Sequence, residues 1–493
     1  MGRGAGGAGA GVVTGGIEVS GGAGGVAASY EDMLSQADVL DLAGDDLRDV
    51  GSRLAGMIGE GDLWQAALLC PGEVAAVQVS VARASSGPDG ALWAGGEVEI
   101  TARYLRVAVD VYRFTDATLA AGEEALWTVG GWTFGAVLPV AAVGAAGVLI
   151  TNPALMVLLL GDKDDLLNEV EELVYDDPWL LEAFTRLAPG AVQGTSFTLA
   201  ALIPLGPLAL MGLTRGKWPS GDYETSVAGL AALARNLGHL RDTGDFGVTA
   251  VDDPLGIRIA QEHAVETIFD QQGVTSTHDG RVQIITVGGD SPSYIVQVPG
   301  TQDWSTQRGD NPVDLTTNIA LMAGDDTVMA DLVADAMREA GIPPGAPVML
   351  TGHSQGGITA MAMAADPDLQ REFSITSVVT GGSPVGRIDV PEGVSVLSLE
   401  HTQDVVPMLD GADNPDRPEW TTVRRELSDA EGGGGSAADR GPGGAHSIDN
   451  YAQTGAAADS SHDSSLERWR ENNSSFFGSG QAQQYQIGAL AGG

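Results

Sequence analysis

The residues best suited to chemistry in this chain of 493 residues lie in the pentapeptide Gly352-His353-Ser354-Gln355-Gly356. A serine hydroxyl becomes a nucleophile when a base takes its proton, and its oxygen must stand clear of the backbone for a carbonyl carbon to reach it. Glycines on both sides permit the tight strand-to-helix turn that exposes such a serine. The flanking apolar residues predict a buried strand at Pro347 to Thr351 and a helix from about Gly357 to Ala365. We therefore predict that Ser354 is a catalytic nucleophile.

A catalytic acid is expected after the serine in the chain, followed by a histidine. The apolar strand predicted at Val394 to Glu400 ends shortly before Asp404. Loops at the C-terminal ends of parallel strands face ligands in such sheets. Asp404 is therefore the predicted acid, with Asp410 and Asp413 as nearby alternatives.

The base must come from the histidines that follow this acid. Of the seven histidines in the chain, His446 and His462 do so. His446 lies in a glycine-rich loop that enters a helix, whereas His462 lies in a Ser/Asp-rich stretch typical of a solvated surface. We predict that His446 is the base and keep His462 as the alternative.

The developing oxyanion also needs hydrogen-bond donors. The backbone N–H of Gln355 is one candidate, because it opens the helix after Ser354. The other is Thr301, which follows a predicted strand ending in Pro299-Gly300 and can offer both an N–H and a hydroxyl. No cofactor or metal ion is expected for this chemistry.

Taken together, these motifs resemble those of the class 3 lipases, the fungal triacylglycerol lipase type within the α/β-hydrolases. The likeness covers about residues 255 to 480 and rests on Gly300-Thr301 with Asp303-Trp304, Gly-His-Ser-Gln-Gly-Gly, Asp404-Val405-Val406-Pro407, and His446 with Tyr451. It implies the triad Ser354, Asp404 and His446, with Thr301 and Gln355 in the oxyanion hole. That family usually has Arg where this chain has Pro299, and Leu where it has Gln355.

The elements around these motifs predict an α/β fold. Short β-rich runs at Val282 to Val287 and Tyr294 to Val298 are separated by turn residues and indicate a hairpin. Strands then alternate with helices, which favours a mostly parallel sheet. Helices are also predicted at Ser226 to Leu240 and Ile259 to Phe269. We assign residues 216–493 to this α/β-hydrolase (lipase-like) domain.

The preceding residues predict a different organisation. The Gly-rich residues 1–25 are expected to be disordered, and apolar residues at three- and four-residue spacing predict an all-helical domain over 26–124. The single cysteine, Cys70, lies in an apolar run and is expected to be buried. Trp93-Ala94-Gly95, taken as a turn between helices, and Tyr112 with Asp116 resemble motifs of type VII (ESX) secretion substrates. That resemblance implies a helical partner or secretion machinery.

Residues 125–215 contain two long uncharged runs, within 125–160 and 187–214. Each exceeds the roughly 20 residues that cross a bilayer, although prolines and glycines interrupt both. These runs fit either a membrane-inserting hairpin or an apolar helical layer buried against the rest of the protein. Contact with a membrane through them is the favoured interpretation.

The net charge of the chain limits the classes of molecule that it is expected to bind. A net charge of −41 makes nucleic-acid binding improbable, because phosphates would be repelled. The N-terminal residues lack the compact apolar segment of a signal peptide, which favours secretion by another route or membrane association. The leading hypothesis is a secreted serine carboxylester hydrolase acting on acyl esters or lipids. The alternatives are an inactive hydrolase fold with a structural role in membrane insertion or secretion, and an acyltransferase or peptidase on the same scaffold.

Overall fold

The structure is a computed structural model that describes residues 12–14, 16–87, 90–110, 113, 223–236, 240, 245–251, 254–303, 310–404, 406–427 and 442–489. The chain divides into a helical unit, Met1–Gly7 with Val26–Gly122, and a sheet unit, Ala8–Gly25 with Glu123–Gly493. The two apolar runs within 125–160 and 187–214, with Tyr112 and Asp116, lie outside the described residues. Among the helices that are described, none is both long and apolar enough to span a bilayer.

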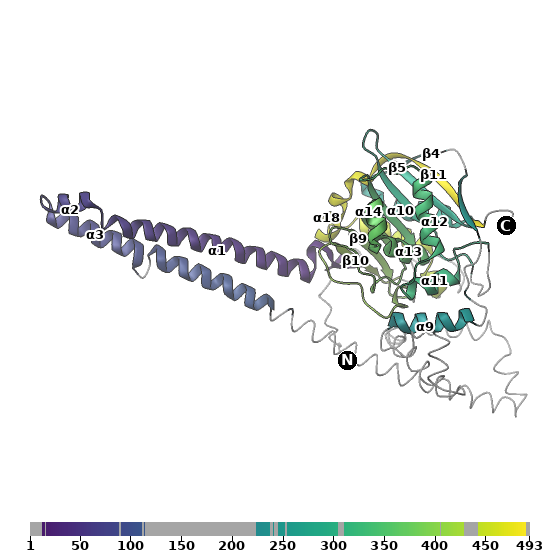
Figure 1. Cartoon of the computed structure of the whole chain (residues 1–493), viewed down its shortest axis with the longest axis horizontal. Coiled ribbons are helices and arrows are strands. Elements are labelled where there is room, and N and C mark those ends of the chain that lie inside the picture. The colour runs from purple at the N-terminus through teal and green to yellow at the C-terminus, as the bar shows by residue number, and fades with distance from the viewer. Residues whose placement is uncertain are drawn as a thin grey trace, which may run out of the picture. The chain divides into compact units, whose positions relative to one another are not determined.

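The described strands of the sheet unit form one mixed sheet of eleven strands (Figure 1). Its order is β1-β2-β10-β9-β8-β7-β6-β5-β11-β3, with β4 paired to β11. The five central strands, β6 to β10, are parallel, and antiparallel strands flank them on both sides. The bounds are β1 (Val12–Thr14), β2 (Ile17–Gly21), β3 (Phe246–Ala250), β4 (Leu255–Ile259), β5 (Arg281–Val287), β6 (Ser293–Val298), β7 (Pro347–His353), β8 (Ser374–Gly381), β9 (Ser395–His401), β10 (Trp420–Arg425) and β11 (Gly478–Ala489). The predicted α/β class is confirmed.

Helices cover both faces of this sheet. One hydrophobic core lies under α12 (Val328–Glu339) and α13 (Gln355–Ala365). The other lies under α10 (Ala264–Ser276), α17 (Ile448–Asp459) and α18 (Ser464–Asn472). All six residues of β6 are buried, as expected for a strand with packed layers on both faces. The helices and strands predicted around Ser354 are confirmed to within a few residues.

Polar caps define where several of these helices begin. Asp314 precedes α11 (Leu315–Met322) and accepts from the N–H of Thr317, and Thr327 caps α12 in the same way through Ala330. Each cap satisfies an N–H that has no partner within its helix. Helix α9 (Tyr223–Asn236) packs its apolar residues on α11.

Two sequence predictions about the edges of the sheet were wrong. Residues 12–14 and 16–25, expected to be disordered, form β1, β2 and a short 3-10 helix, η1 (Gly22–Gly24). Strand β2 pairs with β10, and its Ile17 and Val19 are buried in the core. Ile259, expected to open a helix, ends β4 instead, and α10 begins at Ala264. In both places pairing with a strand distant in sequence decided the local structure.

The helical unit contains α1 (Val26–Met57), α2 (Gly61–Ala67) and α3 (Pro71–Ser86), followed by a helix over 91–110. The last helix packs closely on α1, since a Cβ built on Gly95 would lie 2.8 Å from the carbonyl oxygen of Gly44. Arg106 adds ion pairs to Asp38 and Asp41 at 2.6 and 2.7 Å. The two helices are therefore held by small residues and by charge pairs.

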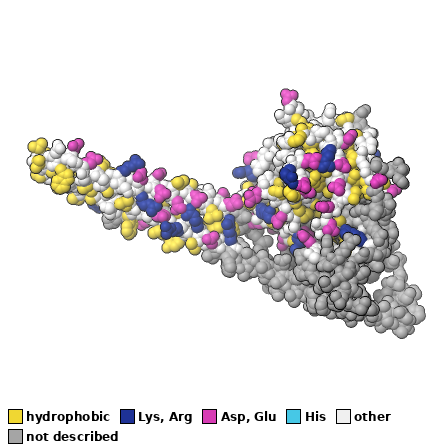
Figure 2. Space-filling model, viewed as in Figure 1, with side chains coloured by type: hydrophobic (Ala, Val, Ile, Leu, Met, Phe, Trp, Pro, Cys, Tyr) yellow, Lys and Arg dark blue, Asp and Glu magenta, His cyan; other side chains and the backbone are white. Residues whose placement is uncertain are grey.

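Two expectations for the helical unit differ from the structure. Trp93-Ala94-Gly95 lies inside the helix over 91–110, so the turn precedes Trp93. Cys70, expected to be buried, is exposed between α2 and α3. Its neighbours Leu68 and Leu69 are 86% and 85% exposed. Hydrophobic side chains are accordingly visible along the surface of this unit (Figure 2).

Candidate active site

Ser354 occupies a strained turn between β7 and α13. Its φ of 57° and ψ of −127° lie in a region that residues with a side chain rarely adopt. The turn needs glycine on both sides, because a Cβ on Gly352 would lie 2.1 Å from the carbonyl carbon of Gly356, and one on Gly356 would lie 2.1 Å from the carbonyl oxygen of Val298. Backbone strain at a single serine is typical of a position with a chemical role.

Ser383 supports this turn from the segment that follows β8. Its hydroxyl donates to the carbonyl oxygen of Ser354 at 2.8 Å, and the N–H of Ser354 donates to the carbonyl of Gly381 at 2.9 Å. These bonds fix the backbone of the serine from the β8 side. They do not restrain the side chain of Ser354.

The structure brings Asp404 and His446 together at the C-terminal end of the parallel strands. His446 Nδ1 donates to Asp404 Oδ2 at 2.7 Å, and the buried hydroxyl of Tyr451 donates to the same oxygen at 2.7 Å. The N–H of Val406 donates to the other oxygen at 2.9 Å. Burial alone would raise the pKa of Asp404, but these hydrogen bonds and the nearby imidazole lower it below its ordinary value. The carboxylate is thus kept ionised and directed at His446.

The alternatives for the acid and the base lie elsewhere. His462 is 94% exposed and pairs with Glu467. Asp410 is buried, its pKa is raised to about 7 by that burial, and its Oδ1 accepts from the N–H of Ala412. Asp413 is an exposed loop residue. His446 and Asp404 are the pair that the geometry selects.

Gly382 joins this pair to the serine turn. Its φ is +61°, and a Cβ built on it would lie 3.0 Å from both Asp404 Oδ2 and His446 Nδ1. It follows directly on Gly381, whose carbonyl binds Ser354. Among the described residues, no hydrogen bond joins Ser354 Oγ to His446. Such bonds are often long in proteins without substrate and tighten when it binds.

The predicted oxyanion donors lie on the other side of the serine. A Cβ built on Gly300 would lie 3.4 Å from the Cβ of Ser354, so the residue directly before Thr301 lies beside the nucleophile. Asn318 Nδ2 donates to Thr301 Oγ1 at 2.8 Å, which leaves the hydroxyl hydrogen of Thr301 free to point elsewhere. Gln355 is buried, and its side-chain amide donates to the carbonyl of Asp314 at 2.6 Å. The backbone N–H of Gln355 lies at the start of α13, and its role as an oxyanion donor stays a prediction.

Sequence reasoning missed three contributors to this site: Gly382, Asn318 and the contact between Tyr451 and Asp404. It also gave no role to His353, whose ring lies 4.4 Å from that of His446. Burial lowers the pKa of His353 to about 3, so this ring is neutral beside His446. Gly382 has a visible signal, because it follows a strand in the pair Gly381-Gly382. The other contacts join segments with no shared local pattern.

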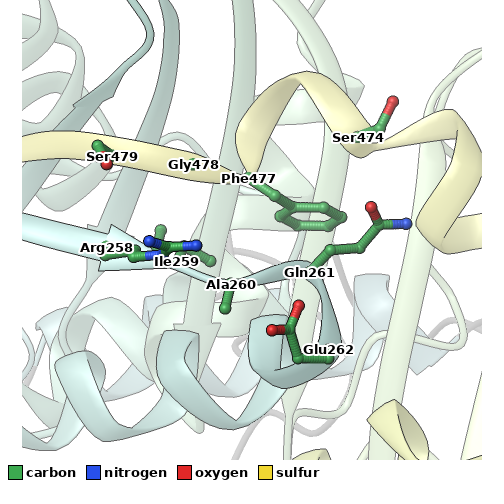
Figure 3. Close-up of a pocket in the computed structure, with 9 residues that line it drawn as sticks. All are labelled: Arg258, Ile259, Ala260, Gln261, Glu262, Ser474, Phe477, Gly478 and Ser479. Carbon is green, nitrogen blue, oxygen red and sulfur yellow. The ribbon is translucent and has the colours of Figure 1, made fainter.

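One pocket of about 280 Å³ lies away from these residues (Figure 3). It opens between the start of β11 and the turn from β4 into the 3-10 helix η2 (Gln261–His263). Arg258, Glu262 and Phe477 are among its lining residues, and none of the candidate active-site residues contributes to it. The pocket is mostly open to solvent and has no part in the chemistry considered below.

Comparisons with known proteins give no further guide to this site. No protein-family model, curated protein or solved structure matches the chain.

Proposed function

We propose that the sheet unit is a serine carboxylester hydrolase of the α/β-hydrolase type, similar to lipases. The observation that carries the proposal is the hydrogen bond between His446 Nδ1 and the buried Asp404, placed beside a serine held at a φ of 57°. A strained backbone at the serine and a buried carboxylate both cost folding free energy. Nucleophilic catalysis is a function that uses the serine, the imidazole and the carboxylate together.

In the proposed reaction, Ser354 Oγ attacks the carbonyl carbon of an acyl ester while His446 Nε2 takes the proton. The carbonyl oxygen becomes an oxyanion and accepts hydrogen bonds from the N–H of Gln355 and from Thr301. Collapse of the intermediate expels the alcohol, which takes the proton from His446 and leaves an acyl group on Ser354. A water molecule activated by His446 then releases the acid, while Asp404 remains ionised and orients the imidazole.

The proposed substrates are acyl esters, with lipids as the class that the sequence resemblance suggests. The neutral His353 ring and the net charge of −41 favour an uncharged ester over an anionic one. Action outside the cell and contact with a membrane belong to the same proposal and rest on the sequence alone.

Replacement of the nucleophile tests the function directly. Ser354→Ala should lower kcat on p-nitrophenyl esters of short acids by at least about 10⁴-fold, because no other group replaces the attacking oxygen. The same change should abolish labelling by a fluorophosphonate probe. Circular dichroism and a cooperative unfolding curve serve as controls for the fold. Equal turnover or equal labelling in the two proteins would exclude Ser354 as the nucleophile, and wild-type protein that does neither would favour an inactive hydrolase fold.

A further inference from the structure

A fully buried imidazole, His401, lies behind the residues that carry the proposed reaction. We propose that His401 is a positioning residue, which fixes the loop bearing His446 by donating a hydrogen bond to the carbonyl of Ala445. The inference rests on the proposed function and assigns this side chain a part in the same site.

The contacts of His401 connect it indirectly to both His446 and Asp404. It ends β9, three residues before Asp404. Its Nδ1 lies 2.7 Å from the carbonyl oxygen of Ala445, the residue directly before His446. Its ring stacks on Tyr451 with centroids 3.9 Å apart, and Tyr451 in turn donates to Asp404. His401 therefore supports the base through the backbone and the acid through an aromatic neighbour.

The protonation of His401 defines which group donates. Burial lowers its pKa to about 4, so at neutral pH the ring carries one proton. A carbonyl oxygen can only accept, so that proton is on Nδ1. Nε2 can then only accept, and it lies 2.8 Å from Thr454 Oγ1, whose single hydroxyl hydrogen is shared between Nε2 and the carbonyl of Asn450 at 3.0 Å. The carbonyl of Ala445 thus selects the Nδ1–H tautomer.

The segment before His446 forms only a short helix, α16 (Pro442–Ala445), and needs such an anchor because its residues are small. It reads Pro442-Gly443-Gly444-Ala445, and glycines give a chain wide freedom that must be lost to place the next side chain. Asn450 Nδ2 holds the carbonyl of Gly444 at 2.8 Å. His401 holds the following carbonyl, so two successive carbonyls are fixed just before the base.

Replacing His401 with Asn or with Gln tests the hydrogen bonds of Nδ1 and Nε2 separately. The amide nitrogen of Asn can replace Nδ1, whereas that of Gln reaches the position of Nε2. We expect His401→Gln to lower kcat about 10- to 100-fold with KM changed less than about twofold, because a small displacement of a catalytic group has effects of that size. His401→Asn should stay within about fivefold of wild type. The surface variant His462→Asn is the matched control. Equal losses in the two position-401 variants, or a Gln variant as active as wild type, would overturn the proposal.

A second measurement does not depend on catalysis. Nitrogen-15 spectra of the imidazoles in the wild-type chain should show His401 as the Nδ1–H tautomer, and the Nε2–H tautomer would overturn the proposal. The low-field proton shared by His446 and Asp404 should broaden in His401→Gln and persist in His401→Asn. If wild-type protein hydrolyses no ester and does not label at Ser354, the proposed function fails while these spectra still decide whether His401 positions His446.

Discussion

The interactions within the sheet unit differ in kind from those within the helical unit. In the sheet unit, charged and polar side chains such as Asp404 and His401 are completely buried and have specific partners. In the helical unit, large apolar side chains such as Trp64 and Leu68 are exposed, and the charges pair near the surface. A buried hydrogen-bonded group fixes geometry because every alternative leaves it unpaired. We infer that positional accuracy resides in the sheet unit, whereas the helical unit tolerates change. The following substitutions test this difference, from the largest expected effect to the smallest.

The largest effect is expected where a buried charge orients the base. Asp404→Asn should lower kcat on short acyl esters by about 10³- to 10⁴-fold, because an amide cannot stabilise the imidazolium and favours the wrong tautomer. Asp413→Asn, at an exposed loop position, should leave kcat within about twofold. Steady-state kinetics on both variants measures the difference in kcat. An equal loss of kcat in the Asp413 variant would contradict the assignment of Asp404 as the residue that orients the base.

The buried imidazole His401 should also make the sheet unit sensitive to acid. Its pKa is about 4 in the folded chain and 6.5 in the unfolded one, so between these values the unfolded state binds more protons. The stability of the wild type should therefore fall as the pH drops from about 6.5 to about 4, whereas Asn at this position does not titrate. The free energy of unfolding of His401→Asn relative to wild type should rise by about 3 kcal/mol between pH 7 and pH 4. Urea unfolding at both pH values measures it, and an unchanged difference would mean that His401 titrates normally.

In the helical unit, the tightest contact is between backbones. Gly95→Leu should destabilise this unit by about 1 to 2 kcal/mol, because the new side chain meets the carbonyl oxygen of Gly44. Its neighbour Gly96 has open space around it, so Gly96→Leu should be neutral or stabilising. Helical circular dichroism during heating compares the two. Ester turnover should remain unchanged in both variants, and a loss of turnover would show that the units are coupled.

The smallest effect is expected at the ion pairs of the helical unit. Arg106→Ala removes the pairs with Asp38 and Asp41, which are partly exposed to solvent. The expected loss of stability is small, because solvent screens the pairs, and it should shrink further in high salt. Thermal unfolding in low and high salt would check this, and a loss that persists in high salt would indicate that Arg106 contributes by packing.

The sequence predicted the parts of the site whose signals are local. The glycines around Ser354 are visible because they lie within two residues of the serine and are required by its turn. Asp404 and His446 could be found by their order in the chain, since each follows a recognisable element. The hydrogen bond between Asn318 and Thr301 joins a helix to a loop and leaves no pattern in either segment.

The same limit explains the errors in the fold. Ile259 lies in an apolar run that suits a helix or a strand, and pairing of β4 with β11 decided between them. Strand β2 is five residues long within a glycine-rich stretch, so composition predicted disorder. Its partner β10 lies far away along the chain, and no local signal reports such a pairing.

The pairing of β2 with β10 also constrains how the protein is made. During synthesis, β2 leaves the ribosome long before the partners that bury it, since the bond from Ser465 to Gly21 spans 444 positions. Until then Ile17 and Val19 belong to a strand whose β10-facing edge is unpaired, and such an edge is prone to associate with other chains. The sheet unit can therefore close only after β10 and Ser465 have been synthesised, and a stop before them would leave β2 without its site.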